Sequence, residues 1–152
     1  MDIFDEMKKE HKEFKKLADD ITETTERAIK TREKKFLKLS TELMAHHQAE
    51  EKVLVPVLKD HKETKKMGIE IEEEHHVAKQ IIYELRDIEV DKENWLVKFE
   101  VLKEITVHHM KEEENEITKK GREVIEKARL EKMADKFEKE VEKQKQEMMT
   151  KA

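Results

Sequence analysis

The sequence contains almost no residues that interrupt helices, since only two glycines and one proline occur among 152 residues. A chain of this length is expected to form one domain with a substantial core. A sheet protein of the same length would need many more turn residues. Lys and Glu are abundant and 47% of the residues are charged, which is typical of long helices with solvated outer faces. The sequence therefore predicts an all-α fold.

The amino-acid usage argues against several classes of function. The net charge is −5, and acidic and basic residues alternate along every segment, so no basic stripe indicates a nucleic-acid partner. Cysteine is absent, which leaves histidine, carboxylate and water as candidate metal ligands. No Gly-rich phosphate loop is present, and Ser40 is the single serine, so hydrolytic or nucleophilic chemistry is not indicated.

The apolar segments are too short to suggest a membrane protein. The longest apolar run, residues 53–58, contains Pro56, and the first residues lack the basic and apolar regions of a secretory signal. A helix that spans a membrane needs about 20 apolar residues. We therefore expect a soluble cytoplasmic protein.

Four successive segments show the spacing of amphipathic helices, with apolar residues every three or four positions. They cover about residues 3–28, 31–56, 69–88 and 92–120, and Gly121 is placed to end or interrupt the fourth. Short connections between four helices predict an up-down-up-down four-helix bundle over residues 1–120. Residues 121–152 carry near-heptad apolar positions, which predict an additional C-terminal helix that packs on the bundle or on a partner, including a second copy of the chain in a homo-oligomer.

Histidine and glutamate occur four residues apart on the second and fourth helices, and such pairs share one helix face. In the segment His46-His47-Gln48-Ala49-Glu50-Glu51, His46 and Glu50 are in line with the apolar stripe. His47 and Glu51 lie one step round the helix, so we interpret them as rim groups or as groups that orient the ligands. An ionised glutamate buried without compensation costs several kcal/mol, so Glu50 needs a cation beside it.

The other helices place further candidate ligands on their apolar stripes. On the fourth helix, His109 and Glu113 are in line with Phe99, Leu102 and Ile117, whereas the shifted pair His108 and Glu112 leads into polar residues. His11 and His75 occupy core positions on the first and third helices. Four histidines and two carboxylates fit a dinuclear metal centre, with donors that suit iron, manganese or zinc. The candidate ligands are His11, His46, Glu50, His75, His109 and Glu113.

These motifs, in this order and spacing, resemble the hemerythrin family and in particular the bacterial and archaeal HHE cation-binding domains. The similarity rests on Glu10-His11, on residues 46–51 followed by Val53-Leu54-Val55-Pro56, on Glu74-His75, and on residues 109–114 with Ile117; residues 121–138 also resemble the helix that follows in that family. The resemblance implies two non-heme iron ions in an Fe–O–Fe type centre, bridged by Glu50 and Glu113. His11 and His46 would serve one iron, and His75 and His109 the other.

One position departs from the oxygen-carrying members of the family, which have a second histidine four residues after the one on the third helix. This chain has Lys79 there, and a protonated lysine cannot act as a ligand. The centre is then one imidazole short, and water, His76 or Glu114 would fill the position. An open position favours reactivity with O2, peroxide or nitric oxide over reversible carriage of oxygen.

The resemblance leaves three functions to be distinguished. The first is a di-iron protein that binds O2 or a related small ligand, as a carrier, store or sensor. The second is a di-iron enzyme that acts on peroxide, nitric oxide or ferrous iron. The third is a metal-dependent interaction module, in which iron or zinc fixes the bundle and the C-terminal helix contacts a partner.

Overall fold

The computed structural model describes residues 1–151, and every regular element within that range is helical. The four long helices of the bundle are α1 (Ile3–Thr22), α2 (Ile29–Val53), α4 (Lys65–Arg86) and α5 (Glu93–Glu112). Shorter elements connect or extend them: η1 (Glu26–Ala28), α3 (Val55–Lys59), the π-helical segment η2 (Glu113–Ile117) and α6 (Thr118–Val124). The last element is α7 (Lys127–Lys151). The predicted all-α fold is confirmed.

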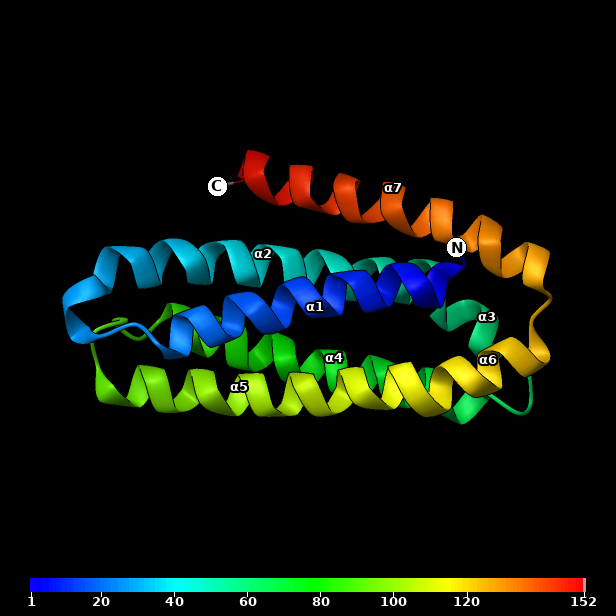
Figure 1. Cartoon of the computed structure of the whole chain (residues 1–152), viewed down its shortest axis with the longest axis horizontal. Helices are drawn as coiled ribbons and strands as arrows, with labels where there is room; N and C mark the ends of the chain where they lie inside the picture. Colours follow the sequence, from blue (N-terminus) through cyan, green and yellow to red (C-terminus); the bar gives the residue numbers. More distant parts are fainter. Residues whose placement is uncertain (152) are drawn as a thin grey trace.

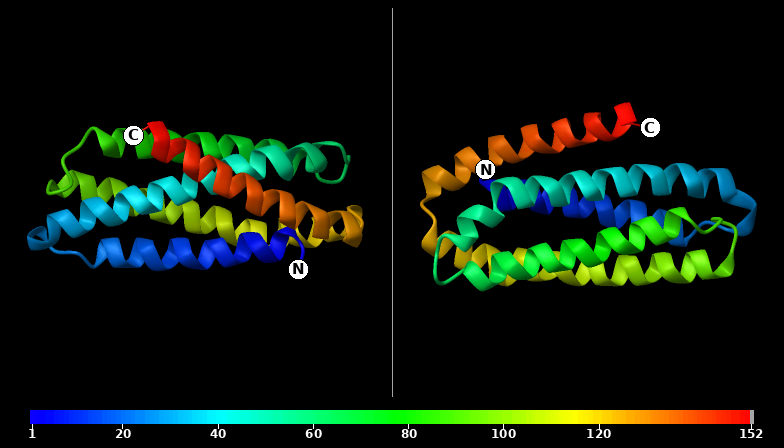
Figure 2. Two further views of the ribbon diagram at one scale, coloured as in Figure 1. Left: turned by 90° about the horizontal axis from the view of Figure 1, so that it is seen from above. Right: turned by 180° about the vertical axis from the view of Figure 1, so that it is seen from behind.

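Successive long helices run in opposite directions along one axis, as expected for an up-down-up-down bundle (Figure 1). Contacts join α1 to α2, α2 to α4, α4 to α5 and α5 to α1, so the four helices enclose a common interior. Helix α7 lies outside this set and crosses α2 obliquely (Figure 2). The predicted bundle with an additional C-terminal helix is therefore the observed architecture.

The apolar core consists of two clusters of buried residues, one toward each end of the bundle. Trp95 and Phe99 stack in the cluster near the α4–α5 connection, and Phe36 packs edge-on against both. The other cluster includes Ile3, Ile71 and residues of α7. Along each long helix, with η2 as the continuation of α5, buried histidine comes between residues of the two clusters, so a polar layer separates two apolar ends.

Polar contacts fix the start of α1 against α6. Asp2 caps the helix by accepting a hydrogen bond from the Asp5 backbone N–H, while the Asp5 side chain accepts one from the Asp2 backbone N–H. Arg122 of α6 then donates hydrogen bonds to both carboxylates, at 3.0–3.2 Å. These contacts hold the end of the fourth bundle helix beside the beginning of the first.

The expectation that Gly121 ends or interrupts the fourth helix is wrong. Helical structure continues through it to Val124, and the chain becomes extended at Ile125. Gly121 instead permits close packing, because a Cβ atom there would collide with the Phe4 ring. The glycine is needed for a contact between helices rather than for a turn.

Helix α7 packs its apolar face on α1 and α2 of its own chain. The buried residues on this face are Leu130, Met133, Ala134, Phe137 and Val141. Association of α7 with a partner or with a second copy of the chain stays a prediction. Within residues 1–151, no helix has the length and apolar character needed to cross a membrane.

Candidate metal centre

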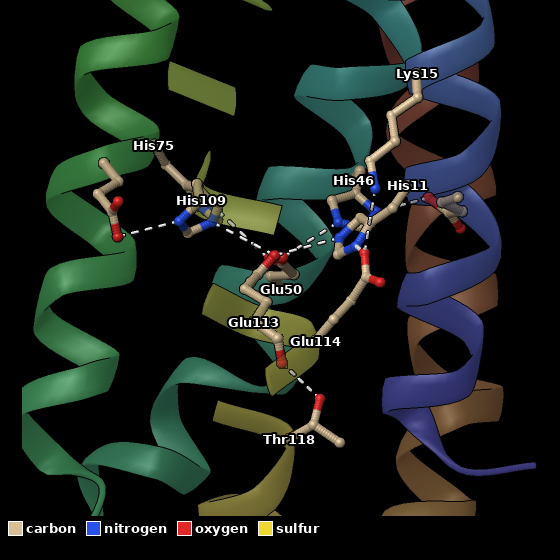
Figure 3. Close-up of polar contacts among 11 residues, drawn as sticks. His11, Lys15, His46, Glu50, His75, His109, Glu113, Glu114 and Thr118 are labelled. Atoms are coloured by element: carbon tan, nitrogen blue, oxygen red, sulfur yellow. Dashed lines mark hydrogen bonds and ion pairs between the residues drawn. The ribbon is translucent and has the colours of Figure 1, made fainter. Parts of the chain in front are cut away.

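Six buried side chains from the four long helices and η2 meet in the middle of the bundle (Figure 3). We call His11 and His46 the first side of this centre, and His75 and His109 the second side. On each side, ligand atoms of the two histidines and of both Glu50 and Glu113 all lie within 4.8 Å of one another. None of the six residues is more than 4% exposed. The structure therefore brings together all the candidate ligands that the helical stripes predicted.

Each buried glutamate lies between a histidine of the first side and a histidine of the second. Glu50 Oε1 is 3.2 Å from His46 Nε2, and its Oε2 is 3.4 Å from His75 Nε2. Glu113 Oε1 is 3.3 Å from His11 Nε2 and 3.5 Å from Nε2 of the second-side histidine on α5. This is the placement that a carboxylate shared by two ions requires.

The inward-facing atoms approach one another without forming hydrogen bonds. Both oxygens of Glu50 and Glu113 and the four Nε2 atoms are buried and lack a partner in hydrogen-bond geometry. Buried polar atoms without partners are rare in folded proteins and call for an explanation. Imidazole nitrogens and carboxylate oxygens that converge in this way fit a transition-metal centre.

Electrostatic interactions in the metal-free chain favour charged imidazoles beside charged carboxylates. Burial acts to lower the pKa of His46, but Glu50 and Glu10 outweigh it and raise that pKa to about 10. His109 is also buried, and Glu113 and Glu74 raise its pKa to about 11. Burial alone would raise the pKa of Glu113, yet His109 and His11 hold it well below the usual value. The neighbouring carboxylates thus favour the protonated form of His46 and His109 in the absence of metal.

The outer nitrogen of each histidine faces a glutamate on the neighbouring helix. His46 Nδ1 donates to Glu10 and His11 Nδ1 donates to Glu114, both at 2.9 Å. On the second side the contacts are looser, since His109 Nδ1 lies 3.1 Å from Glu74 and His75 Nδ1 lies 3.7 Å from Glu51, both outside hydrogen-bond geometry. The four contacts form a closed circuit from α1 to α2, α4, the α5–η2 helix and back to α1. Such outer carboxylates fix the tautomer and ring orientation of metal-binding histidines.

The π-helical segment η2 begins at Glu113 itself. The Thr118 hydroxyl donates to the Glu113 backbone carbonyl, five residues earlier, at 2.5 Å (Figure 3). Short π-helical turns within α-helices often occur at functional sites. Here the turn lies where the chain presents Glu113 inward and Glu114 toward His11.

His47 is more deeply buried than one of its two sequence interpretations implies. The sequence predicted a rim group or a group that orients the ligands; the side chain is 6% exposed, so the rim position is wrong and the orienting role stays a prediction. Its ring stacks on His75 with centroids 3.8 Å apart, and it forms a further group with His75 and His109 whose ligand atoms lie within 4.8 Å of one another. Burial and the neighbouring His75 lower the pKa of His47 well below its usual value. The two adjacent histidines at positions 46 and 47 are the sequence feature that could have indicated a second buried imidazole on this helix.

The bundle and its His/Glu centre define a class of helical metal-binding domain, and comparison with known families identifies it. Residues 2–121 match the model of the hemerythrin HHE cation-binding domain. No curated protein and no solved structure matches the chain. The chain belongs to the hemerythrin HHE cation-binding family, and its domain is a metal-binding helical domain.

Proposed function

We propose that this chain is a non-heme di-iron protein that binds O2 or a related small ligand as a carrier, store or sensor. The observation that supports the proposal best is that Glu50 and Glu113 each approach one histidine from each side of the centre. The proposed ligands are His11 and His46 for one ion, His75 and His109 for the other, and both glutamates for the pair. Ferrous iron at this position would supply electrons and coordination sites for the small ligand.

The residues of the chain perform three tasks in this proposal. The four histidines offer imidazole nitrogens as ligands. The outer glutamates hold the rings in place by accepting from Nδ1. The apolar clusters on both sides of the polar layer restrict the entry of water, and Phe137 of α7 covers His46 with ring centroids 5.4 Å apart.

The proposal is tested by metal content and by the visible spectrum of the purified protein. We expect two irons per chain and a spectral change on exposure to O2 that reverses when O2 is removed. A protein that binds one zinc, or that binds iron without any response to O2 or nitric oxide, would contradict the proposal.

A di-iron enzyme is the second candidate, favoured by two recesses that reach the histidines from the surface. One recess includes His46 and lies between α1, α2 and α7; the other includes His47 and His75 and lies between α2 and α4. Sustained consumption of peroxide or nitric oxide, or oxidation of added ferrous iron, would distinguish this function from reversible binding. A metal-dependent interaction module would instead change its oligomeric state on metal loading without turnover.

A further inference from the structure

We propose that His47 is a third imidazole ligand of the second side, beside His75 and His109. This inference rests on the di-iron function proposed above and assigns a ligand beyond the six already named. Oxygen-carrying relatives would be expected to supply a third imidazole from the third bundle helix. In this chain the third imidazole would come from α2.

The position of His47 supports this role. Its side chain is almost as inaccessible as those of the six candidate ligands. One of its ring nitrogens lies within 4.8 Å of ligand atoms of His75 and His109, and its Nε2 is buried with no hydrogen-bond partner. An unpartnered imidazole nitrogen beside two others is the arrangement that metal binding would satisfy.

Other side chains considered for the same position are placed elsewhere. His76 is exposed. Glu114 accepts a hydrogen bond from His11 on the first side. Lys79 is also exposed, and its ammonium lies 5.8 Å from the centre of the Tyr83 ring. Among the imidazoles near the second side, His47 alone is both buried and adjacent to His75 and His109 within the described residues.

The stack of His47 on His75 places a condition on this role. The lone pair of an imidazole nitrogen lies in the plane of its ring, and these two planes are only 12° from parallel. Two stacked rings cannot both direct a lone pair at one ion, so at least one ring must turn when metal binds. The alternative is that His47 only packs against His75, and the two roles predict opposite results for two substitutions.

His47→Phe keeps an aromatic ring for the stack but offers no ligand atom. His47→Glu removes the ring but offers a carboxylate oxygen at a similar reach. The test uses the metal-free full-length chain, with ferrous iron added under anaerobic conditions, and measures the dissociation constants of the first and second ions by equilibrium dialysis. His76→Phe is the matched control, because His76 borders the same recess and is exposed.

We expect His47→Phe to weaken binding of the second ion by about tenfold or more, since even outer partners of metal ligands contribute about 10–100-fold to affinity. His47→Glu should retain the second ion more tightly than His47→Phe does, and His76→Phe should bind as the unmodified chain does. Thermal unfolding of the metal-free variants separates loss of ligation from loss of folding.

The reverse order, with His47→Phe binding two ions normally and His47→Glu losing one, would overturn the ligand role and leave the di-iron centre intact. Equal binding by both variants and the unmodified chain would overturn it as well. An unmodified chain that binds no second ion would instead contradict the proposed function, and with it the role of His47.

Discussion

The two sides of the candidate metal centre use the same residue types but hold them differently. On the first side, His11 and His46 each donate a 2.9 Å hydrogen bond to an outer glutamate. On the second side, the outer glutamates lie 3.1 and 3.7 Å from His109 and His75, outside hydrogen-bond geometry. The second side instead has the additional ring of His47 stacked on His75.

This difference shows two ways to position imidazoles inside a bundle. Hydrogen bonds to outer carboxylates fix the ring orientation before metal arrives. Packing among rings keeps the imidazoles together but leaves their orientation free to change on binding. We therefore expect the first side to be the more preorganised and the second to rearrange more, and the following changes test this difference.

The largest effect is expected for Glu50→Gln, because Glu50 approaches both sides of the centre, as Glu113 does, and is fully buried. The neutral amide keeps the shape but not the charge of a bridging carboxylate, so both ions should be lost or bound far more weakly. Metal content per chain measures this. Glu33→Gln, an exposed position on the same helix, is the control and should keep both ions.

Single histidine substitutions should affect one side at a time. His46→Ala should remove the first-side ion and His109→Ala the second-side ion, so metal content falls from two per chain to about one or less. His108→Ala is the matched control, since His108 and Glu112 form a similar i,i+4 pair on the same helix but are 71% and 40% exposed. His61→Ala should also leave metal content unchanged, because the His61 Nδ1 donates to the Val57 backbone carbonyl and, among the described residues, His61 is in none of the groups of converging ligands. Equal losses in all four variants would refute the assignment of inward and outward histidines.

The outer glutamates should show a smaller and unequal effect. Glu10→Gln removes the charge that His46 faces at hydrogen-bond distance, and we expect iron affinity at the first side to fall about 10–100-fold. Glu51→Gln should have less effect, because Glu51 is 3.7 Å from His75 and 39% exposed. Iron titrations of the two variants compare them directly. A larger loss for Glu51→Gln would reverse our view of which side is preorganised.

The smallest effect concerns the pH dependence of the metal-free protein. The pKa values of His46 and His109 are raised to about 10 and 11, so their contribution to stability is complete below about pH 6.5 and is lost as pH rises through the folded-state values. Glu113 has a lowered pKa, and its contribution is lost as pH falls below about 4.5.

We therefore expect the urea midpoint of the metal-free chain to decrease from pH 6 to pH 9.5. Iron binding should strengthen over the same range, because protons compete with the ion for the same nitrogens. A metal-free midpoint that rises over this range would show that the histidine–glutamate pairs do not contribute in this way.

The sequence was sufficient to predict the helical fold and the inward orientation of six polar residues. The 3.6-residue period places His46 rather than His47, and Glu113 rather than Glu112, in line with apolar neighbours. A second residue one step round a helix can also be buried when a neighbouring helix lies close, as α4 does beside His47. That closeness depends on packing between helices and is not visible in a single helical stripe.

The remaining features depend on contacts between distant parts of the chain. The sequence suggested that Gly121 ends a helix. A glycine is needed there because the ring of Phe4, near the other end of the sequence, packs against it. The hydrogen bond between His11 and Glu114 joins residues 103 positions apart. A glutamate that directly precedes a histidine in the sequence contacts a histidine ring on another helix. Which glutamate faces which histidine could therefore not be inferred from their order in the sequence.

The most direct test of the central claim is anomalous X-ray diffraction at the iron edge from crystals of the iron-loaded chain. The account predicts two adjacent iron peaks in the polar layer, one near His11 and His46, the other near His75 and His109, with Glu50 and Glu113 between them. A single peak, or iron bound away from this layer, would contradict it.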